Sequence, residues 1–451
     1  MINVDWTPKL AARLERSSFF VAGKAKAKIA GVEGGKAAQN IQIRFSIFVY
    51  VKHLVIIGLV IPEPASTAAG SRMMQLIRVF EENQYKITFL TASNNIEFSE
   101  KMEVEKIEIN NDSFNEKIRN LNPDVVLFDR YVTEEQFGWR VSENCPNALK
   151  IIDTEDLHFL REARRKAFVE KRELENEDFI NDVFKREIAS ILRCDLSLII
   201  SEFEFELLTE KFKINPDILF YMPFLTEKIE KNKTVFEKRK HFVSIGNFLH
   251  EPNWQTVLKF KSIWKNIRKQ LPDVELHIYG AYASQKVFQL HQEKEGFLVK
   301  GRAEKVENIF NQYRVLLAPI PFGAGLKGKL WESMQFGLPN VTSSIGAEAM
   351  HKYLPWNGFI EDSDEEFVEK AVELYQNESV WNLANGNALE ILKLVFDKQL
   401  YVNHFWKRLS DIENNLENHR AENYLGRILQ HHQLNSTKYM SRWIEEKNKK
   451  L

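Results

Sequence analysis

The sequence predicts an α/β protein with two domains, each built around a parallel β-sheet. Two observations carry this prediction. Short, nearly continuous apolar segments recur along the chain between segments of helical spacing, which is the pattern of a parallel sheet covered by helices on both faces. The pattern is interrupted once by a charged segment, residues 226–240, and then restarts. We therefore expect two Rossmann-like domains facing a cleft.

The first series of predicted strands begins at His53. Its members are residues 53–60, 86–92, 125–129, 148–153, 196–201 and 218–223. Helical patterns lie between several of them. In residues 71–83, for example, one stripe carries Met73, Leu76, Ile77 and Phe80.

The second series consists of residues 241–246, 274–280, 296–301, 314–320, 340–344 and 358–362. The helices expected between these strands are residues 253–270, 283–294, 304–313, 328–336 and 364–376. The strands end in Gly, Pro, Asp or Ser, so each opens a loop at the carboxyl edge of its sheet. Open α/β sheets bind their ligands at this edge.

Four boundaries follow from these patterns. We expect an N-terminal extension of poor order at 1–50, a first domain at 51–228, a linker at 229–240, a second domain at 241–400, and a helical tail at 401–451. The extension lacks a clear period and is rich in Gly, Ala and Lys. The tail is expected to pack back on the first domain through Trp406, Tyr439 and Trp443.

Composition excludes several classes of function. The chain has 451 residues, with 62 basic and 63 acidic side chains, so no net field favours nucleic acid. The only cysteines, Cys145 and Cys194, form no zinc-type spacing, and we expect both to be small buried hydrophobes in a reducing cytoplasm. The apolar segment 45–61 contains Lys52 and His53, and its uninterrupted part is shorter than the ~20 residues of a membrane span.

The segment with the most chemistry is residues 318–344. A predicted strand is followed by a turn with Gly323, Gly325 and Gly328, and then by a helix. Glycines let backbone N–H groups approach a ligand closely, and a helix N-terminus favours phosphate.

Three charged side chains accompany this turn. Lys327 and Lys329 add full positive charge, and Glu332 lies about one turn into the helix, where a carboxylate can hold the two hydroxyls of a ribose. The turn does not have the Walker A spacing. The alternative is a glycine-rich connector before an ordinary amphipathic helix.

Residues 242–258, 278–280, 300–301 and 318–344 resemble the donor domain of GT-B glycosyltransferases, in particular the retaining family 4 within glycosyl transferases group 1. The first domain resembles the group more weakly, and the whole resemblance covers residues 53–400. It implies that a sugar is transferred from a UDP- or GDP-sugar with retention of configuration. It also implies that no metal ion and no permanently bound cofactor take part.

The resemblance assigns ribose binding to Glu332. The family's other motif glutamate would fall at position 324, where this chain has Ala324. The backbone N–H groups of Ala324, Gly325 and Leu326 are then expected to hold sugar hydroxyls. Asn247 stands at one of the usual basic positions, so neutralising the diphosphate depends more on the two lysines.

The remaining predicted donor residues lie at the ends of other strands. They are Gly246, Asn247, Tyr279, Gly280, Gly301, Arg302, Gly323, Lys327 and Lys329. Tyr279 or Tyr282 would stack on the base, with core packing as an equal alternative.

The first domain is expected to contribute donor groups as well. The N–H groups of Gly70 and Ser71 would meet the phosphate from the other side, with help from Arg72. Ser71 is alternatively a helix N-cap.

The predicted catalytic residues are Asp156, His158 and Lys327. Asp156 and His158 follow the predicted strand at 148–153, and a residue there would bind the sugar or take a proton from the acceptor. A structural hydrogen bond is the alternative for His158. The resemblance implies front-side attack without a protein nucleophile.

The basic run 161–172 is either a solvated face or a contact with an anionic membrane or a lipid-diphosphate acceptor.

The favoured function is therefore a hexosyltransferase-like enzyme of polysaccharide biosynthesis. It would act on a glycan or lipid-linked acceptor in the cytoplasm or at the inner face of the membrane. The alternative is a non-catalytic GT-B module that binds sugar nucleotide or glycan and supports another transferase. A third class is an epimerase or phosphorylase, although the sequence contains no signature of the lysine-bound pyridoxal phosphate that a phosphorylase needs.

Overall fold

The computed structural model describes residues 50–64, 67–93, 102–228, 234–303, 305–431 and 433–448. The predicted extension at 1–50 lies, except for its last residue, outside the described part of the chain. The elements below all belong to the unit His53–Leu451.

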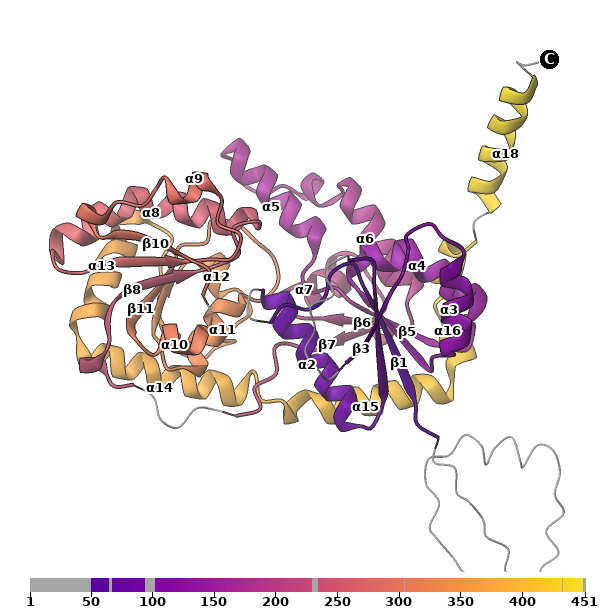
Figure 1. The fold of residues 1–451 in the computed structure, drawn as a ribbon, viewed down its shortest axis with the longest axis horizontal. Coiled ribbons are helices and arrows are strands. Elements are labelled where there is room, and N and C mark those ends of the chain that lie inside the picture. The colour runs from indigo at the N-terminus through magenta and orange to yellow at the C-terminus, as the bar shows by residue number, and fades with distance from the viewer. Residues whose placement is uncertain are drawn as a thin grey trace, which may run out of the picture. The chain divides into compact units, whose positions relative to one another are not determined.

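The first sheet has seven described strands (Figure 1). They are β1 (His53–Gly58), β2 (Lys86–Thr91), β3 (Glu103–Lys106), β4 (Val125–Asp129), β5 (Leu149–Asp153), β6 (Leu196–Ile199) and β7 (Leu219–Tyr221). Their order is β3-β2-β1-β4-β5-β6-β7, and every pair is parallel. The six predicted strands are confirmed. The sequence did not indicate β3, because this edge strand (EVEK) is polar and only partly buried.

The second sheet has six described strands. They are β8 (Lys240–Ile245), β9 (Leu276–Tyr279), β10 (Phe297–Gly301), β11 (Tyr313–Ala318), β12 (Asn340–Thr342) and β13 (Gly358–Ile360). The order is β10-β9-β8-β11-β12-β13, again all parallel. All six were predicted. In both sheets the strand order reverses beside the first strand, between β1 and β4 and between β8 and β11, and such reversals open ligand crevices at the carboxyl ends.

Helices cover both faces of each sheet. Those of the first domain are α2 (Ala68–Glu82), α3 (Ser113–Leu121), α4 (Arg130–Asn144), α5 (His158–Glu170), α6 (Asp182–Arg193) and α7 (Glu202–Glu206). Those of the second are α8 (Glu251–Gln270), α9 (Gln285–Phe288), α10 (Val306–Phe310), α11 (Gly328–Gln335), α12 (Ser344–Ala347), α13 (Asp364–Gln376) and α14 (Glu378–Leu394). The predicted helix at 283–294 is wrong beyond Phe288, because Gln292 instead forms a bridge with Phe297 through two backbone hydrogen bonds.

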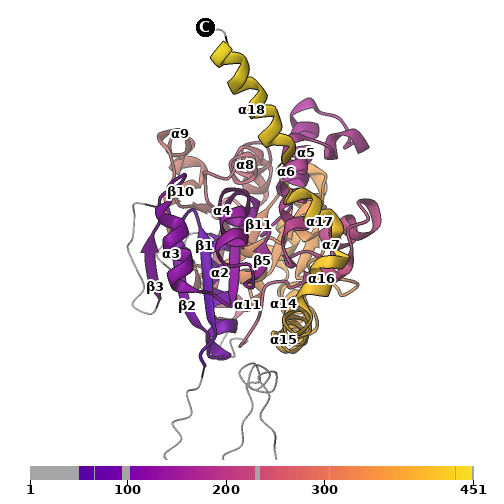
Figure 2. The same cartoon turned by 90° about the vertical axis from the view of Figure 1, so that its right-hand side faces the viewer.

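The C-terminal helices return to the first domain. They are α15 (Gln399–Asn414), α16 (Leu416–Glu422), α17 (Tyr424–Leu429) and α18 (Gln433–Asn448). Phe405, Leu409 and Ile412 of α15 are buried in one cluster with β1 and α2, and α17 packs against α6 (Figure 2). Trp406 stacks on Tyr85, with ring centroids 5.7 Å apart.

Tyr439 and Trp443 on α18 are 61% and 60% exposed, so these two side chains are not buried against the first domain as predicted. Cys145 and Cys194 are buried and unpaired, as expected, and burial raises the pKa of both thiols. None of the described helices has the length and apolar character needed to cross a bilayer.

Truncating Phe405 to alanine tests the packing of α15. The ring is fully buried, and its loss should cost about 3–5 kcal/mol of unfolding free energy. Calorimetry of the full chain should show a lower midpoint for Phe405→Ala. The exposed Trp443→Ala variant is the control, and equal midpoints for the two variants would contradict the docking of α15.

Candidate active site

A cavity of about 410 Å³ lies where the carboxyl ends of the two sheets meet. Many predicted site residues line it. From the first domain they are Arg72, Asp156 and His158, and from the second Gly246, Asn247, Gly280, Arg302, Gly323, Ala324, Leu326, Lys327, Lys329 and Glu332. Gly70, Ser71, Tyr279, Gly301 and Gly325 are not among the lining residues.

The N-termini of two helices, α2 and α11, meet at this cavity. A Cβ placed on Gly328, the first residue of α11, would lie 2.6 Å from the Cβ of Ala68, the first residue of α2. Both residues line the cavity. Each helix start carries free N–H groups and a partial positive charge, so their meeting favours a bound anion.

The start of α2 differs from the prediction in one respect. Thr67, and not Ser71, caps the helix, because its side chain accepts the Gly70 N–H at 2.9 Å. The Ser71 N–H bonds to the Thr67 carbonyl, and its hydroxyl donates to Pro64. Gly70 and Ser71 therefore have no N–H to offer a phosphate. Thr67, Ala68 and Ala69 line the cavity in their place.

Two lysines of the second domain lie at the start of α11. Lys327 Nζ donates to the carbonyls of Ala324 at 3.1 Å and Gly325 at 2.6 Å. Lys329 Nζ donates to Asn253 Oδ1 at 2.8 Å.

Burial shifts the pKa values of both Lys329 and Glu332. Burial lowers the pKa of Lys329 to about 8, with Glu332 acting in the opposite direction. It also raises the pKa of Glu332 to about 7, against the effect of Lys329. The two groups partly compensate each other, and both face the cavity.

The glycine turn is held by the first domain. The Gly325 N–H donates to Glu204 Oε1 at 2.7 Å, so the expectation that this N–H binds the sugar is wrong. Gly325 has φ +62°, and a Cβ there would lie 2.7 Å from the Cβ of Asp156. The Gly323 carbonyl accepts from Arg164 Nη1 at 2.8 Å. Of the three residues whose N–H groups were expected to hold the sugar, Ala324 and Leu326 line the cavity and Gly325 does not.

The tyrosines expected to stack on a base have other partners. Tyr279 hydrogen-bonds Tyr313 through the two hydroxyls at 2.9 Å and packs on the core of the second domain. Tyr282 is exposed and donates to the Glu63 carboxylate at 3.0 Å. The Gly301 carbonyl accepts the Gly280 N–H at 2.8 Å, a structural role at the edge of the cavity.

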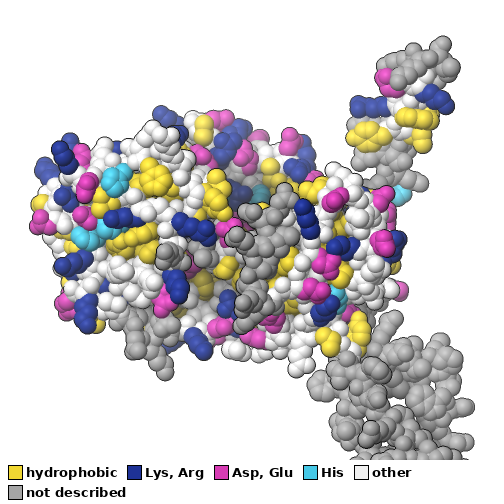
Figure 3. Space-filling model, in the orientation of Figure 1, with side chains coloured by type: hydrophobic (Ala, Val, Ile, Leu, Met, Phe, Trp, Pro, Cys, Tyr) yellow, Lys and Arg dark blue, Asp and Glu magenta, His cyan; other side chains and the backbone are white. Residues whose placement is uncertain are grey.

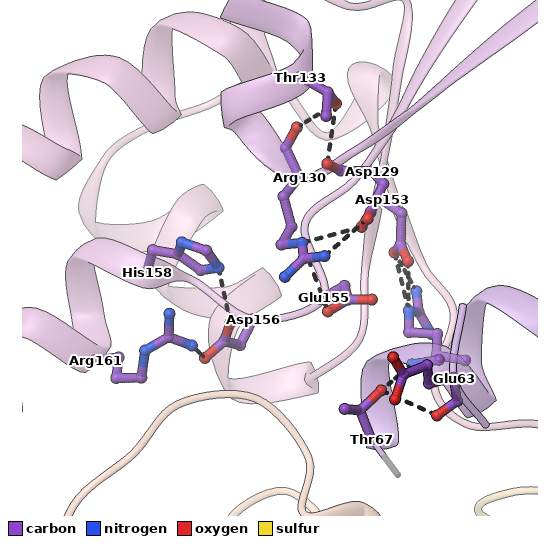
Figure 4. A network of polar contacts seen from close by, with 12 residues as sticks. Glu63, Thr67, Asp129, Arg130, Thr133, Asp153, Glu155, Asp156, His158 and Arg161 are labelled. Carbon is purple, nitrogen blue, oxygen red and sulfur yellow. Dashed lines mark hydrogen bonds and ion pairs between the residues drawn. The ribbon is translucent and has the colours of Figure 1, made fainter. Parts of the chain in front are cut away.

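Asp156 lies at the centre of a polar network (Figure 4). His158 Nε2 is 3.3 Å from one of its oxygens, and Arg161 pairs with the other. Burial acts to raise the pKa of Asp156, but Arg161 and His158 outweigh it and hold this pKa far below its usual value. Asp156 is therefore an ionised hydrogen-bond acceptor and a weak base.

The same network contains residues that the sequence analysis missed. Arg130 follows β4 directly, has φ +67°, and pairs with Asp129 at 2.8 Å. Glu155, with φ +60°, lies 3.9 Å from Arg130 (Figure 4). Burial, followed by the nearby Asp129, raises the pKa of Glu155 well above its ordinary value. Their positions directly after β4 and β5 could have indicated a place in the site, because ligands bind at the carboxyl ends of the strands.

Arg72, expected to assist the phosphate, is instead held by Asp153 at 2.8 Å.

A smaller pocket of about 180 Å³ adjoins the cavity. The two share His158, Arg161, His250, Pro252 and Phe322. Tyr131, Glu162, Val183, Arg165 and Glu251 complete the smaller pocket. His250, which the sequence analysis did not select, therefore lies between the two spaces.

The basic run on α5 is mostly ion-paired. Arg164 forms a two-pronged pair with Glu348 of the second domain, at 2.9 and 2.6 Å. Arg165 pairs with Glu162, and Lys166 and Arg172 pair with Asp178. Figure 3 shows acidic and basic side chains interspersed over the face it draws. Carboxylates therefore neutralise much of the positive charge of this run, and Arg164 joins it to the second domain.

One segment of the chain matches a known protein family. Residues 239–377 match the family model described as glycosyl transferases group 1. No curated protein matches the chain.

Solved structures with a similar fold have low sequence identity to the chain. Sucrose-phosphate synthase from Thermosynechococcus elongatus aligns with a TM-score of 0.61 and 12% identity, over 80% of this chain and 99% of that one. The pneumococcal O-GlcNAc transferase GtfA, in complex with UDP and GlcNAc, aligns with 0.60 and 14% over 80% and 99%. A mutant of S. aureus TarM, in complex with fondaparinux, alpha-GlcNAc-glycerol and UDP, aligns with 0.52 and 14% over 66% of this chain and 58% of that one.

These likenesses establish the fold, and the family model covers the domain that carries the glycine turn and Glu332. The chain thus has the GT-B fold, and its residues 239–377 match the model of glycosyl transferases group 1.

Proposed function

We propose that the protein transfers a sugar from a nucleoside diphosphate sugar to a hydroxyl of a glycan or lipid-linked acceptor, with retention and without a metal ion. The observation that carries this proposal is the meeting of α2 and α11 at one cavity, beside Lys327 and Lys329. Two helix N-termini and two ammonium groups supply the positive charge that a diphosphate needs. Residues 241–400 would hold the donor, and 51–228 the acceptor.

The other parts of the donor have matching partners. Glu332 would accept two hydrogen bonds from the ribose hydroxyls, since a carboxylate binds a diol well. Gly246, Asn247, Gly280 and Arg302 line the side of the cavity left for the base. Two of the three similar structures described above contain UDP, which supports a uridine donor.

The transfer step needs few protein groups. The bond between the anomeric carbon and the phosphate oxygen breaks while the acceptor oxygen bonds to the same face of that carbon. The acceptor proton passes to the departing phosphate oxygen. Lys327 and the helix N-termini would stabilise the charge that develops on this phosphate. Asp156 and His158 would hold hydroxyls of the sugar or the acceptor, which would enter through the smaller pocket.

A non-catalytic role is the second candidate. It is favoured by Ala324, whose side chain packs in an apolar cluster with Leu157 and Leu208, so that position offers the sugar no carboxylate. Hydrolysis of UDP- and GDP-sugars separates the candidates. Turnover that Glu332→Ala abolishes supports the transferase, whereas tight binding without turnover of any donor supports the binding module.

Replacing Glu332 by Gln should weaken nucleotide binding. Loss of charge-assisted hydrogen bonds to the ribose removes about 1.5–3 kcal/mol, or more than tenfold in affinity. Titration calorimetry with UDP and GDP measures this directly. Glu365→Gln, an exposed substitution on α13, is the control. Equal affinities for the two variants would remove Glu332 from the site.

Nucleotide affinity should also fall as the pH rises through about 8. The diphosphate binds the protonated form of Lys329, whose pKa is lowered to about 8 by burial, so deprotonation removes one positive charge from the site. Lys329→Arg keeps its charge at every pH used and should flatten the profile between pH 7 and 9.5. If the wild-type affinity is constant over this range, Lys329 does not bind the diphosphate.

A further inference from the structure

A carboxylate of the first domain reaches into the donor turn of the second. Glu204 lies on α7 and is 0% exposed. Its Oε1 accepts the N–H of Leu157 at 3.0 Å and the N–H of Gly325 at 2.7 Å. One oxygen thus joins the start of α5 in the first domain to the glycine turn of the second.

The second oxygen of Glu204 is also buried. Among the described residues it has no hydrogen-bond partner. A buried acceptor without a partner is costly, so the side chain is not explained by stability alone. Burial, with a contribution from Asp156, raises the pKa of Glu204 to about 7.

The turn that Glu204 holds is the one that places Lys327. Lys327 Nζ donates to the carbonyls of Ala324 and Gly325, on either side of the Gly325 N–H. Gly325 lies against Asp156, and the Gly323 carbonyl is held by Arg164, which also pairs with Glu348. The turn is therefore fixed from the first domain at two points, Gly323 and Gly325.

We propose that Glu204 is a positioning residue, which holds the turn 323–327 against the first domain and so fixes Lys327 and the start of α11 in the geometry that binds the donor diphosphate. This proposal rests on the proposed function for its ligand. The carboxylate acts through the Gly325 backbone. Restricting the turn before binding removes an ordering cost that the ligand would otherwise meet.

Hydrogen–deuterium exchange on the full chain, without ligand, tests the contact itself. Glu204→Ala should increase the exchange rate of the Gly325 amide about tenfold, because its acceptor is gone. Glu204→Gln keeps an oxygen that can accept both N–H groups and should preserve most of the protection. Glu204→Asp, a milder change, should give an intermediate rate and provides the test if the alanine variant fails to fold.

A matched control separates positioning from general stability. Glu134 is an equally buried carboxylate of the first domain, but its partner Arg193 is in the same domain. Glu134→Ala should lower the thermal midpoint and leave the exchange of residues 323–327 unchanged. Unchanged exchange at Gly325 in Glu204→Ala, or an equal increase in Glu134→Ala, would overturn the proposal.

Titration with UDP and GDP then tests the consequence for the donor. Glu204→Ala should weaken binding about tenfold and Glu204→Gln by much less. If exchange rises but affinity does not change, the positioning role is wrong. If the wild-type protein binds neither nucleotide while exchange responds as expected, Glu204 holds the turn but the proposed donor class fails.

Discussion

The site depends on one steric constraint, the close approach of α2 and α11. Gly328 allows it, because any side chain at this position would collide with Ala68. The helix α2 follows β1 of the first sheet, and α11 follows β11 of the second. Each helix begins at a crevice where the strand order of its sheet reverses. Bringing them together places two sets of free N–H groups in one cavity. Without that approach, each domain would have an ordinary helix start and neither would favour a diphosphate strongly.

Several contacts between the domains maintain this approach. Trp331 of α11 stacks on Phe224 at 5.0 Å and donates to Thr226 at 3.1 Å. Thr226 in turn exchanges backbone hydrogen bonds with Phe396 and Lys398, where the chain returns to the first domain. The two segments in which the chain passes between the domains, at Thr226 and at residues 396–398, are thus joined to α11, which carries Lys329 and Glu332. Movement of one domain against the other would change the site at the same time.

Charge in the cavity is balanced by pairing. Lys329 and Glu332 offset each other, and Asp156 pairs with Arg161 and lies against His158. Partly buried ions of this kind are stable only beside partners of opposite charge. A diphosphate that bound there would add negative charge beside the lysines and so favour their protonated forms. The strained backbone at Arg130 and Glu155 lies in the same region, as is common where side chains serve a site.

The sequence was sufficient for both sheets, because apolar runs mark buried strands well. It also indicated the strand, glycine turn and helix of the segment 318–344, which line the cavity. The phosphate and ribose roles of Lys327, Lys329 and Glu332 stay predictions. The sequence could not show that Thr67 rather than Ser71 caps α2, or that Gly325 donates to Glu204, 121 residues earlier in the chain. The Gly325 contact depends on how the domains pack, whereas the cap depends on the residue at which the backbone becomes helical. Tyr279 was ambiguous, since an aromatic ring after a strand suits either a core or a ligand.

The most direct test of the account is a crystal structure of the protein with UDP or GDP, whichever binds more tightly. The account predicts that the diphosphate lies in the cavity at the starts of α2 and α11, beside Lys327 and Lys329, with the ribose on Glu332. A diphosphate bound elsewhere, for example in the smaller pocket beside Tyr131 and Arg165, would contradict it.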